Sequence, residues 1–157
     1  RACYLEEKKD KERLLAIAKA SSSLPYVCPI TYVDGRPMLD GGIVDSIPVL
    51  RAIEQGYERN VVVLTRNRGY RKSEKDIRVP RFIYTRYPRL RVVLSRRCQV
   101  YNQQLEMIER MEDEGRIIAI RPEQRVVVNR IEKDIRKLTS LYEEGYACAE
   151  KVMGQFL

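Results

Sequence analysis

The sequence has 157 residues, a net charge of +8, four cysteines and no histidine. Without histidine, the chain cannot supply a Ser/His/Asp triad, a histidine-ligated metal or a histidine pH switch. The apolar runs are far shorter than the roughly 18 residues that a membrane span needs, and no signal peptide opens the chain. The length fits one compact domain or a large part of one. Because the first residue is Arg1 rather than Met, we expect further residues upstream.

The cysteines, at positions 3, 28, 98 and 148, are widely spaced and form no CxxC pair. With no histidine to complete a zinc shell, no metal is expected. We expect four buried, reduced thiols in a cytoplasmic protein, rather than disulfides or a nucleophile.

Basic residues are concentrated between Arg66 and Arg97, where ten arginines and two lysines stand against two carboxylates. The rest of the chain is therefore slightly acidic. Arginines with interleaved tyrosines can bind the phosphates of nucleic acid or of lipid head groups. A solvated face, with tyrosines packed inward and arginines outward, is an equal alternative, because no nucleic-acid motif accompanies the segment.

The N-terminal part predicts a helix followed by a hairpin. Apolar residues at helical spacing predict a helix from Asp10 to Ala20, which the serines and proline at 21–25 end. Short β-rich pieces at 32–33 and 38–39 flank Asp34-Gly35, a dipeptide typical of a tight hairpin turn.

The next segment alternates helix and strand. Pro48 can open a helix that Gly56 closes. The run NVVVLT at 60–65 is typical of a strand buried on both faces of a parallel sheet. This order predicts an α/β fold.

The C-terminal half is predicted to be mainly helical. Helical spacing from Cys98 onward predicts a helix that ends at Gly115. Residues 117–120 form a further apolar strand. A last helical stretch carries apolar residues from Ile131 to Phe156 and is expected to be interrupted at Gly145.

The segment that carries chemistry centres on Asp40, which follows a short apolar strand and precedes Gly41 and Gly42. Two glycines remove side-chain bulk, so the carboxylate can stand in an open site at the strand end. Such a carboxylate can accept a proton from a hydroxyl or orient a donor. Without its flanks, Asp-Gly-Gly is better interpreted as a turn.

The flanks change that interpretation. The run ASSSLP at 20–25, the hairpin at 34–35, LDGG at 39–42 and Ile-Pro at 47–48 together resemble the second half of a patatin-like phospholipase domain. The similarity continues through 61–72 and, less specifically, to the C-terminus, as in bacterial members of that family.

The resemblance implies a three-layer α/β/α fold, hydrolysis of lipid acyl esters, and a Ser/Asp dyad that needs neither histidine nor a cofactor. It assigns the dyad acid to Asp40. The nucleophile of the family lies in Gly-x-Ser-x-Gly, a pattern that these 157 residues do not contain. We therefore expect residues 1–157 to be the C-terminal part of such a domain with a helical extension, inactive without the nucleophile-bearing N-terminal part.

Further residues are candidates for the substrate side of the site: Ser21, Ser22, Ser23 and Pro25. For the serines, a helix end satisfied by hydroxyls is the favoured alternative. Asp45 is expected to shape the turn before Pro48. Arg121, at the end of a strand, is expected to form a surface ion pair.

The expected partners are an acyl lipid or phospholipid substrate and, peripherally, an anionic membrane. Candidates for the lipid contact are Arg66, Arg68, Arg71 and Lys72. Nucleic acid is not favoured. The alternative function is a non-catalytic, arginine-rich module that binds anionic surfaces or nucleic acid.

Overall fold

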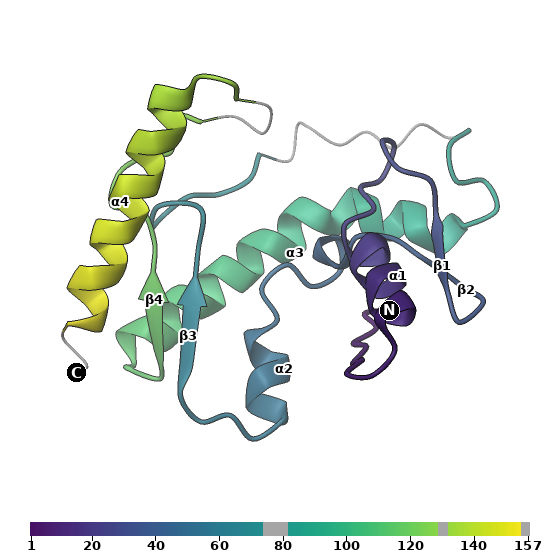
Figure 1. Cartoon of the computed structure of the whole chain (residues 1–157), viewed down its shortest axis with the longest axis horizontal. Helices are drawn as coiled ribbons and strands as arrows, with labels where there is room; N and C mark the ends of the chain where they lie inside the picture. The colour runs from purple at the N-terminus through teal and green to yellow at the C-terminus, as the bar shows by residue number, and fades with distance from the viewer. Residues whose placement is uncertain (74–81, 129–131, 155–157) are drawn as a thin grey trace. The chain divides into compact units, whose positions relative to one another are not determined.

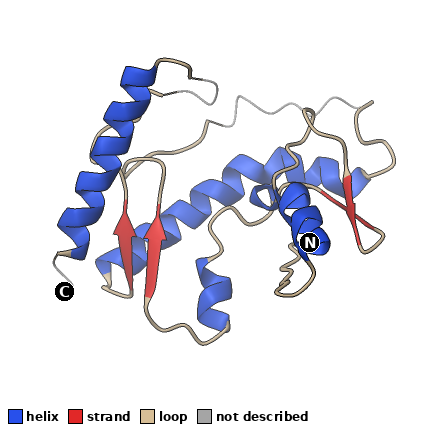
Figure 2. Cartoon of the chain, viewed as in Figure 1, coloured by secondary structure: helices blue, strands red, loops and turns tan. Residues whose placement is uncertain are grey.

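The computed structural model describes residues 1–73, 82–128 and 132–154. They form two compact units, the first made of 1–48 and 72–104, the second of 49–71 and the described residues after 104. Each unit contains helices and a two-stranded sheet (Figure 2). The predicted mixture of helices and strands is confirmed.

The first unit begins with helix α1 (Lys11–Ser21) and a hairpin (Figure 1). The Asp10 carboxylate caps α1 by accepting a hydrogen bond of 3.0 Å from the Arg13 N–H. Strands β1 (Thr31–Val33) and β2 (Arg36–Met38) pair antiparallel. Asp34 and Gly35 connect them with φ angles of 49° and 72°. Two left-handed residues are what a tight hairpin turn requires, so the predicted hairpin is confirmed.

Two further elements complete the first unit. The 3₁₀ turn η1 (Gly41–Ile43) follows β2, and the first part of the long helix α3 (Pro88–Asp113) follows residue 87. The buried apolar residues of this unit include Ala20, Val33, Ile43, Leu94 and Cys98.

The second unit is built around a parallel pair of strands. Helix α2 (Val49–Glu54) leads into β3 (Asn60–Val63), which pairs with β4 (Ile117–Ile120). The ladder continues past β3, because the Leu64 N–H donates to the Ile120 carbonyl at 2.8 Å. The predicted parallel sheet is therefore present, with two strands in the described residues.

One prediction about β3 is wrong. Val62 is buried, but Val61 and Val63 are 48% and 71% exposed, so the strand is not buried on both faces. β-Branched residues favour a strand whether or not its second face is covered. The face that carries Val61 and Val63 is therefore only partly covered by the described residues.

Helix α4 (Ile135–Met153) continues through Gly145, so the predicted interruption is wrong. A glycine inside a helix costs only about 1 kcal/mol, which tertiary contacts can offset. The Asp134 carboxylate caps the helix, and α4 packs on β4 and buries Cys148. Ile131 and Phe156, which also belonged to the predicted stretch, lie outside the described residues.

All four cysteines are free thiols. Cys98 and Cys148 are buried and Cys28 is partly buried, whereas Cys3 is exposed, contrary to the prediction of four buried thiols. Cys3 lies before α1, where the structure has no regular element to cover it. Within the described ranges, no helix is long and apolar enough to cross a membrane.

Ser23 is a buried polar residue, only 4% exposed, and it connects three parts of the first unit. Its hydroxyl donates to the Lys19 carbonyl of α1 at 2.8 Å and lies 2.8 Å from the Thr31 hydroxyl of β1. Its backbone carbonyl accepts from the Asp40 N–H at 2.9 Å. One buried residue therefore fixes the positions of α1, β1 and Asp40.

We expect Ser23→Ala to lower the free energy of unfolding by about 1–3 kcal/mol, because it leaves buried polar partners unsatisfied. Ser22→Ala removes a hydroxyl from the exposed neighbouring residue and is expected to cost about 0.5 kcal/mol or less. Chemical denaturation followed by circular dichroism measures both. Equal losses in the two variants would show that Ser23 has no special role.

Candidate functional site

Asp40 lies between β2 and η1 and is partly buried. Its Oδ1 accepts a hydrogen bond of 2.7 Å from the Gly42 N–H, which caps η1. The turn interpretation of Asp-Gly-Gly therefore describes the backbone correctly. It accounts for only one carboxylate oxygen, because Oδ2 has no hydrogen-bond partner among the residues that the structure describes.

The two glycines after Asp40 are not equivalent. A Cβ added to Gly42 would lie 3.0 Å from Asp40 Oδ1, closer than nearly all real contacts of this kind. A Cβ added to Gly41 would meet nothing nearer than the Ser21 Oγ at 4.0 Å. The absence of a side chain at position 42 therefore leaves the carboxylate in its place.

The second carboxylate of the segment, Asp45, differs from Asp40 because both of its oxygens accept hydrogen bonds. Its Oδ1 accepts a hydrogen bond of 2.6 Å from Gln104 Nε2, and its Oδ2 accepts one from the Tyr4 hydroxyl. Gln104 also accepts from the Ser46 N–H at 3.1 Å. Both oxygens of Asp45 are thus used to hold the loop before α2, which supports its expected role in shaping the turn.

The structure separates the predicted substrate-side residues. The Ser22 hydroxyl donates to the Ala18 carbonyl at 2.9 Å, and Ser23 bonds Lys19, so both hydroxyls satisfy the end of α1, which was the favoured alternative. Pro25 is buried. Ser21 is exposed, and its hydroxyl is the side-chain atom nearest to the open side of Gly41.

One residue beside the site was not identified from the sequence. Arg97 Nε donates to the Gly42 carbonyl at 3.3 Å, which brings a guanidinium to the Asp-Gly-Gly turn. Arg97 lies 55 positions after Gly42, and no local pattern connects a helix residue to a loop so far away. The only signal was its place in the basic segment.

Together these groups define what the site can do. It offers the Oδ2 of Asp40, which can accept a proton, the hydroxyl of Ser21 beside Gly41, and the positive charge of Arg97. In the described part of the chain, no group of three metal-binding side chains of the His, Cys, Asp or Glu type occurs. The carboxylate oxygen is the group of this site that can accept a proton from a hydroxyl.

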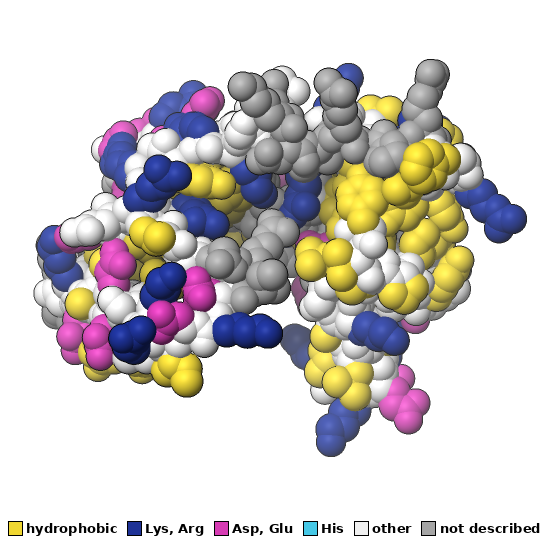
Figure 3. Space-filling view, turned by 90° about the horizontal axis from the view of Figure 1, so that it is seen from above, with side chains coloured by type: hydrophobic (Ala, Val, Ile, Leu, Met, Phe, Trp, Pro, Cys, Tyr) yellow, Lys and Arg dark blue, Asp and Glu magenta, His cyan; other side chains and the backbone are white. Residues whose placement is uncertain are grey.

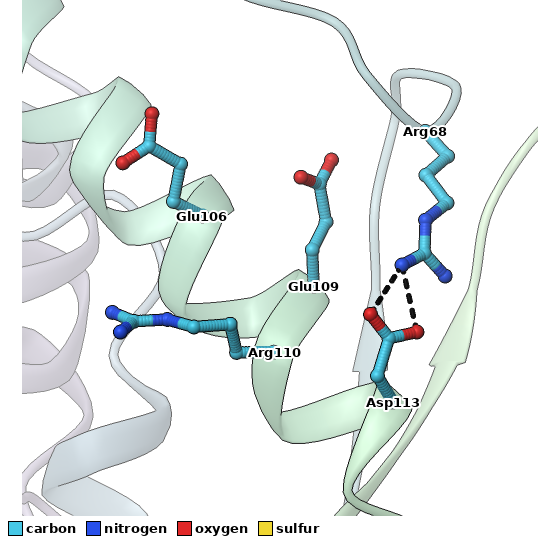
Figure 4. Close-up of a pocket in the computed structure, with 5 residues that line it drawn as sticks. All are labelled: Arg68, Glu106, Glu109, Arg110 and Asp113. Atoms are coloured by element: carbon cyan, nitrogen blue, oxygen red, sulfur yellow. Dashed lines mark hydrogen bonds and ion pairs between the residues drawn. The ribbon is translucent and has the colours of Figure 1, made fainter.

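The arginines proposed for lipid contact lie elsewhere, and two of them are engaged in ion pairs. In the second unit, Arg68 Nη2 lies 2.7 Å from Asp113, and Arg71 Nη2 lies 2.7 Å from Glu109. Figure 4 shows Arg68 reaching across to the carboxylate of Asp113. An anionic lipid would have to replace these carboxylates.

These pairs border a depression of about 440 Å³. Its lining is wholly charged: Arg68, Glu106, Glu109, Arg110 and Asp113. Its two guanidinium groups stand against three carboxylates, and among the described residues no apolar side chain lines it to hold an acyl chain. The depression does not fit the predicted substrate.

The other two candidates pack against tyrosines. Arg66 stacks over the Tyr70 ring, 5.2 Å from its centroid, and donates to the Val126 carbonyl at 3.3 Å. In the first unit, Lys72 Nζ lies 4.3 Å from the centroid of the Tyr101 ring. Such contacts stabilise cations by up to about 2 kcal/mol when they are desolvated.

Carboxylates on α3 form ion pairs with arginines of the second unit, and one of these pairs lowers the pKa of its carboxylate. Arg71 and the Gly69 N–H lower the pKa of Glu109 to about 2. Glu112 lies between Arg68 and Arg121, and it forms an ion pair with each. The expected ion pair of Arg121 is confirmed, but its side chain is only 9% exposed, so the pair is not a surface one.

Two family models match separate parts of the chain. Residues 4–53 match the family model of patatin-like phospholipases. The predicted resemblance is therefore confirmed over the part of the chain that carries α1, the hairpin and Asp40. Residues 87–157 match a second model, a domain of unknown function (DUF6363). No curated protein and no solved structure matches the chain.

We expect Glu109→Gln to destabilise the protein at neutral pH and to have less effect in acid. The carboxyl titrates near its ordinary pKa of 4.5 when unfolded and near 2 when folded. The stabilisation is thus complete above about pH 5 and is lost as the pH falls from about 4.5 to about 2. Denaturation of the two proteins across this range measures it.

A matched control is Glu143→Gln, at an exposed carboxylate without an ion pair in the described ranges. It should remain close to the wild type at pH 7. A difference between Glu109→Gln and wild type that does not shrink in acid would contradict the role of the ion pair.

Proposed function

We propose that the protein hydrolyses acyl esters of lipids and that Asp40 is the acid of a Ser/Asp dyad. The observation that carries this proposal is the state of the Asp40 carboxylate. One oxygen is fixed by the Gly42 N–H, and the other has no hydrogen-bond partner among the described residues and can take a proton. This carboxylate lies within the segment that matches patatin-like phospholipases.

In the proposed mechanism, a serine from a Gly-x-Ser-x-Gly elbow outside these 157 residues attacks the ester carbonyl. Its hydroxyl proton passes to Asp40 Oδ2 as the Oγ–carbon bond forms. The tetrahedral intermediate collapses, the alkoxide leaves with the proton from Asp40, and an acyl-enzyme remains. Water then attacks, Asp40 takes a proton from it, and returning that proton to the serine frees the acid. The 157 residues alone are inactive on this scheme.

We further propose that residues 1–157 are the C-terminal part of a three-layer α/β/α domain with a helical extension. The parallel pairing of β3 with β4 supports this, since parallel sheets are normally covered on both faces. The exposed Val61 and Val63 support it as well, because their side chains are suited to an apolar layer.

The first test replaces each carboxylate in a protein that includes the nucleophile elbow. Asp40→Asn is expected to lower kcat by about 10² to 10⁴-fold, the usual contribution of general acid–base catalysis. Asp45→Asn is the matched control, since both oxygens of Asp45 are already bonded, and it should retain activity. Hydrolysis of a soluble ester measures both. Retained activity in a folded Asp40→Asn protein, or the absence of an elbow from the upstream coding sequence, would refute the dyad.

The second test uses the two glycines. Gly42→Val is expected to displace the Asp40 carboxylate and to reduce kcat about tenfold to a hundredfold, as small misplacements of catalytic groups do. Gly41→Val introduces the same side chain where space is open and should have little effect. Comparable kcat values for the two variants would show that Asp40 need not be held in this position.

A further inference from the structure

Four tyrosines connect three segments of the first unit. The Tyr26 N–H donates to the Tyr84 hydroxyl at 3.0 Å, and the two rings lie 5.8 Å apart. A hydrogen bond with Tyr32 of β1 raises the pKa of the Tyr87 phenol. We call Tyr26, Tyr32, Tyr84 and Tyr87 the tyrosine cluster. It fixes the loop after α1, the hairpin and the entry to α3 in one surface.

Two members of the cluster adopt unusual backbone conformations. Tyr26 and Tyr84 have φ angles of 68° and 57°, in the left-handed region that residues with large side chains seldom occupy. Such conformations persist where surrounding contacts impose them, and they occur preferentially at ligand sites and switch regions.

The surface beside the cluster is unusually apolar. Val27 is 78% exposed, Phe82 80% and Tyr32 60%. Figure 3 shows hydrophobic side chains gathered over the part of the chain that carries α1, β1 and β2, at the right of that view. Apolar side chains exposed together commonly mark an interaction site.

The segment that begins at Phe82 is rich in positive charge. From Phe82 to Leu105 the sequence has five arginines and neither aspartate nor glutamate. Arg86 and Arg89 are exposed and, unlike Arg68 and Arg71, form no ion pair among the described residues. The nearest carboxylate of the hairpin, Asp34, is paired with Arg13 at 2.8 Å.

We propose that this surface, made of Val27, Phe82, Arg86 and Arg89 on the tyrosine cluster, docks on an anionic lipid bilayer. Apolar tips that enter the head-group region, tyrosines at its level and arginines facing lipid phosphates form the usual combination at a membrane interface. The apolar aliphatic tip, Val27, favours lipid over nucleic acid, since it cannot stack on a base. The choice of lipid as partner rests on the proposed function.

The surface is joined to the Asp40 site through the backbone. Tyr26 follows Ser23 by three residues, and the Ser23 carbonyl accepts the Asp40 N–H at 2.9 Å. Docking at Val27 therefore brings lipid to the segment that positions the proposed dyad acid.

The sequence contains no tryptophan, so a single introduced tryptophan reports on its own environment. In Phe82→Trp, we expect the emission to shift to the blue on addition of phosphatidylglycerol vesicles and to be quenched by brominated lipid. The control is Val127→Trp, at a valine of the second unit that is 83% exposed. Its emission should not change.

Binding strength is measured by sedimentation with the same vesicles. Val27→Ser should weaken binding about tenfold, and Arg86→Gln or Arg89→Gln about fivefold each, which corresponds to roughly 1 kcal/mol for each arginine near the surface. Arg125→Gln and Val127→Ser, at exposed residues of the second unit, should leave it unchanged.

Several outcomes would overturn the proposal. One is an emission of Phe82→Trp that does not change when vesicles are added. Another is a loss of vesicle binding in the control variants equal to that in Val27→Ser or the arginine variants. A third is binding of an oligonucleotide without binding of vesicles. None of these measurements requires hydrolysis. Soluble-ester hydrolysis without vesicle binding would therefore refute docking alone, whereas vesicle binding with an active Asp40→Asn protein would support docking and refute the dyad.

Discussion

The arrangement of the first unit depends on the hydrogen bonds of one buried polar residue, Ser23. Burying a hydroxyl is costly unless it is hydrogen-bonded, so its partners are strongly constrained. Here those partners are the last turn of α1 and Thr31 of β1, and the backbone carbonyl of the same residue holds Asp40. The position of the proposed catalytic carboxylate is therefore set by the same contacts that terminate the helix and align the hairpin.

Local sequence signals predicted most of the elements, although α3 begins at Pro88, ten residues before the predicted start at Cys98. Asp34-Gly35 specified a left-handed turn, and Gly115, with a φ of 69°, ends α3 where expected. The failures concern burial and continuity, which depend on residues distant in sequence. A valine run has the same local pattern whether one face of a strand is covered or two, and Gly145 breaks a helix only where tertiary contacts do not outweigh its cost.

The candidate site was predictable only in part for the same reason. Asp40 could be identified because the glycines that accommodate it are adjacent in sequence. The engagement of Asp45 by Gln104 and the approach of Arg97 to Gly42 could not, because each joins α3 to a loop more than 50 residues earlier. The ion pairs of the basic segment could not be predicted either, because their carboxylates lie on α3, far away in the sequence. The net charge of the segment gave no indication that Arg68 and Arg71 pair with carboxylates of α3, whereas Arg86 and Arg89 form no ion pair with any described residue.

This division of the arginines changes what the basic segment can do. Cations already paired with carboxylates gain little from a phosphate, because the new contact replaces an existing one of similar strength. Cations without a partner gain the full interaction, and apolar neighbours reduce the water that competes for it. Affinity for an anionic surface is therefore expected at the tyrosine cluster rather than at residues 66–72, although residues 66–72 are the more basic stretch in the sequence. The cluster belongs to the same unit as Asp40, so the proposed docking on lipid and the proposed proton transfer both depend on the packing of that unit.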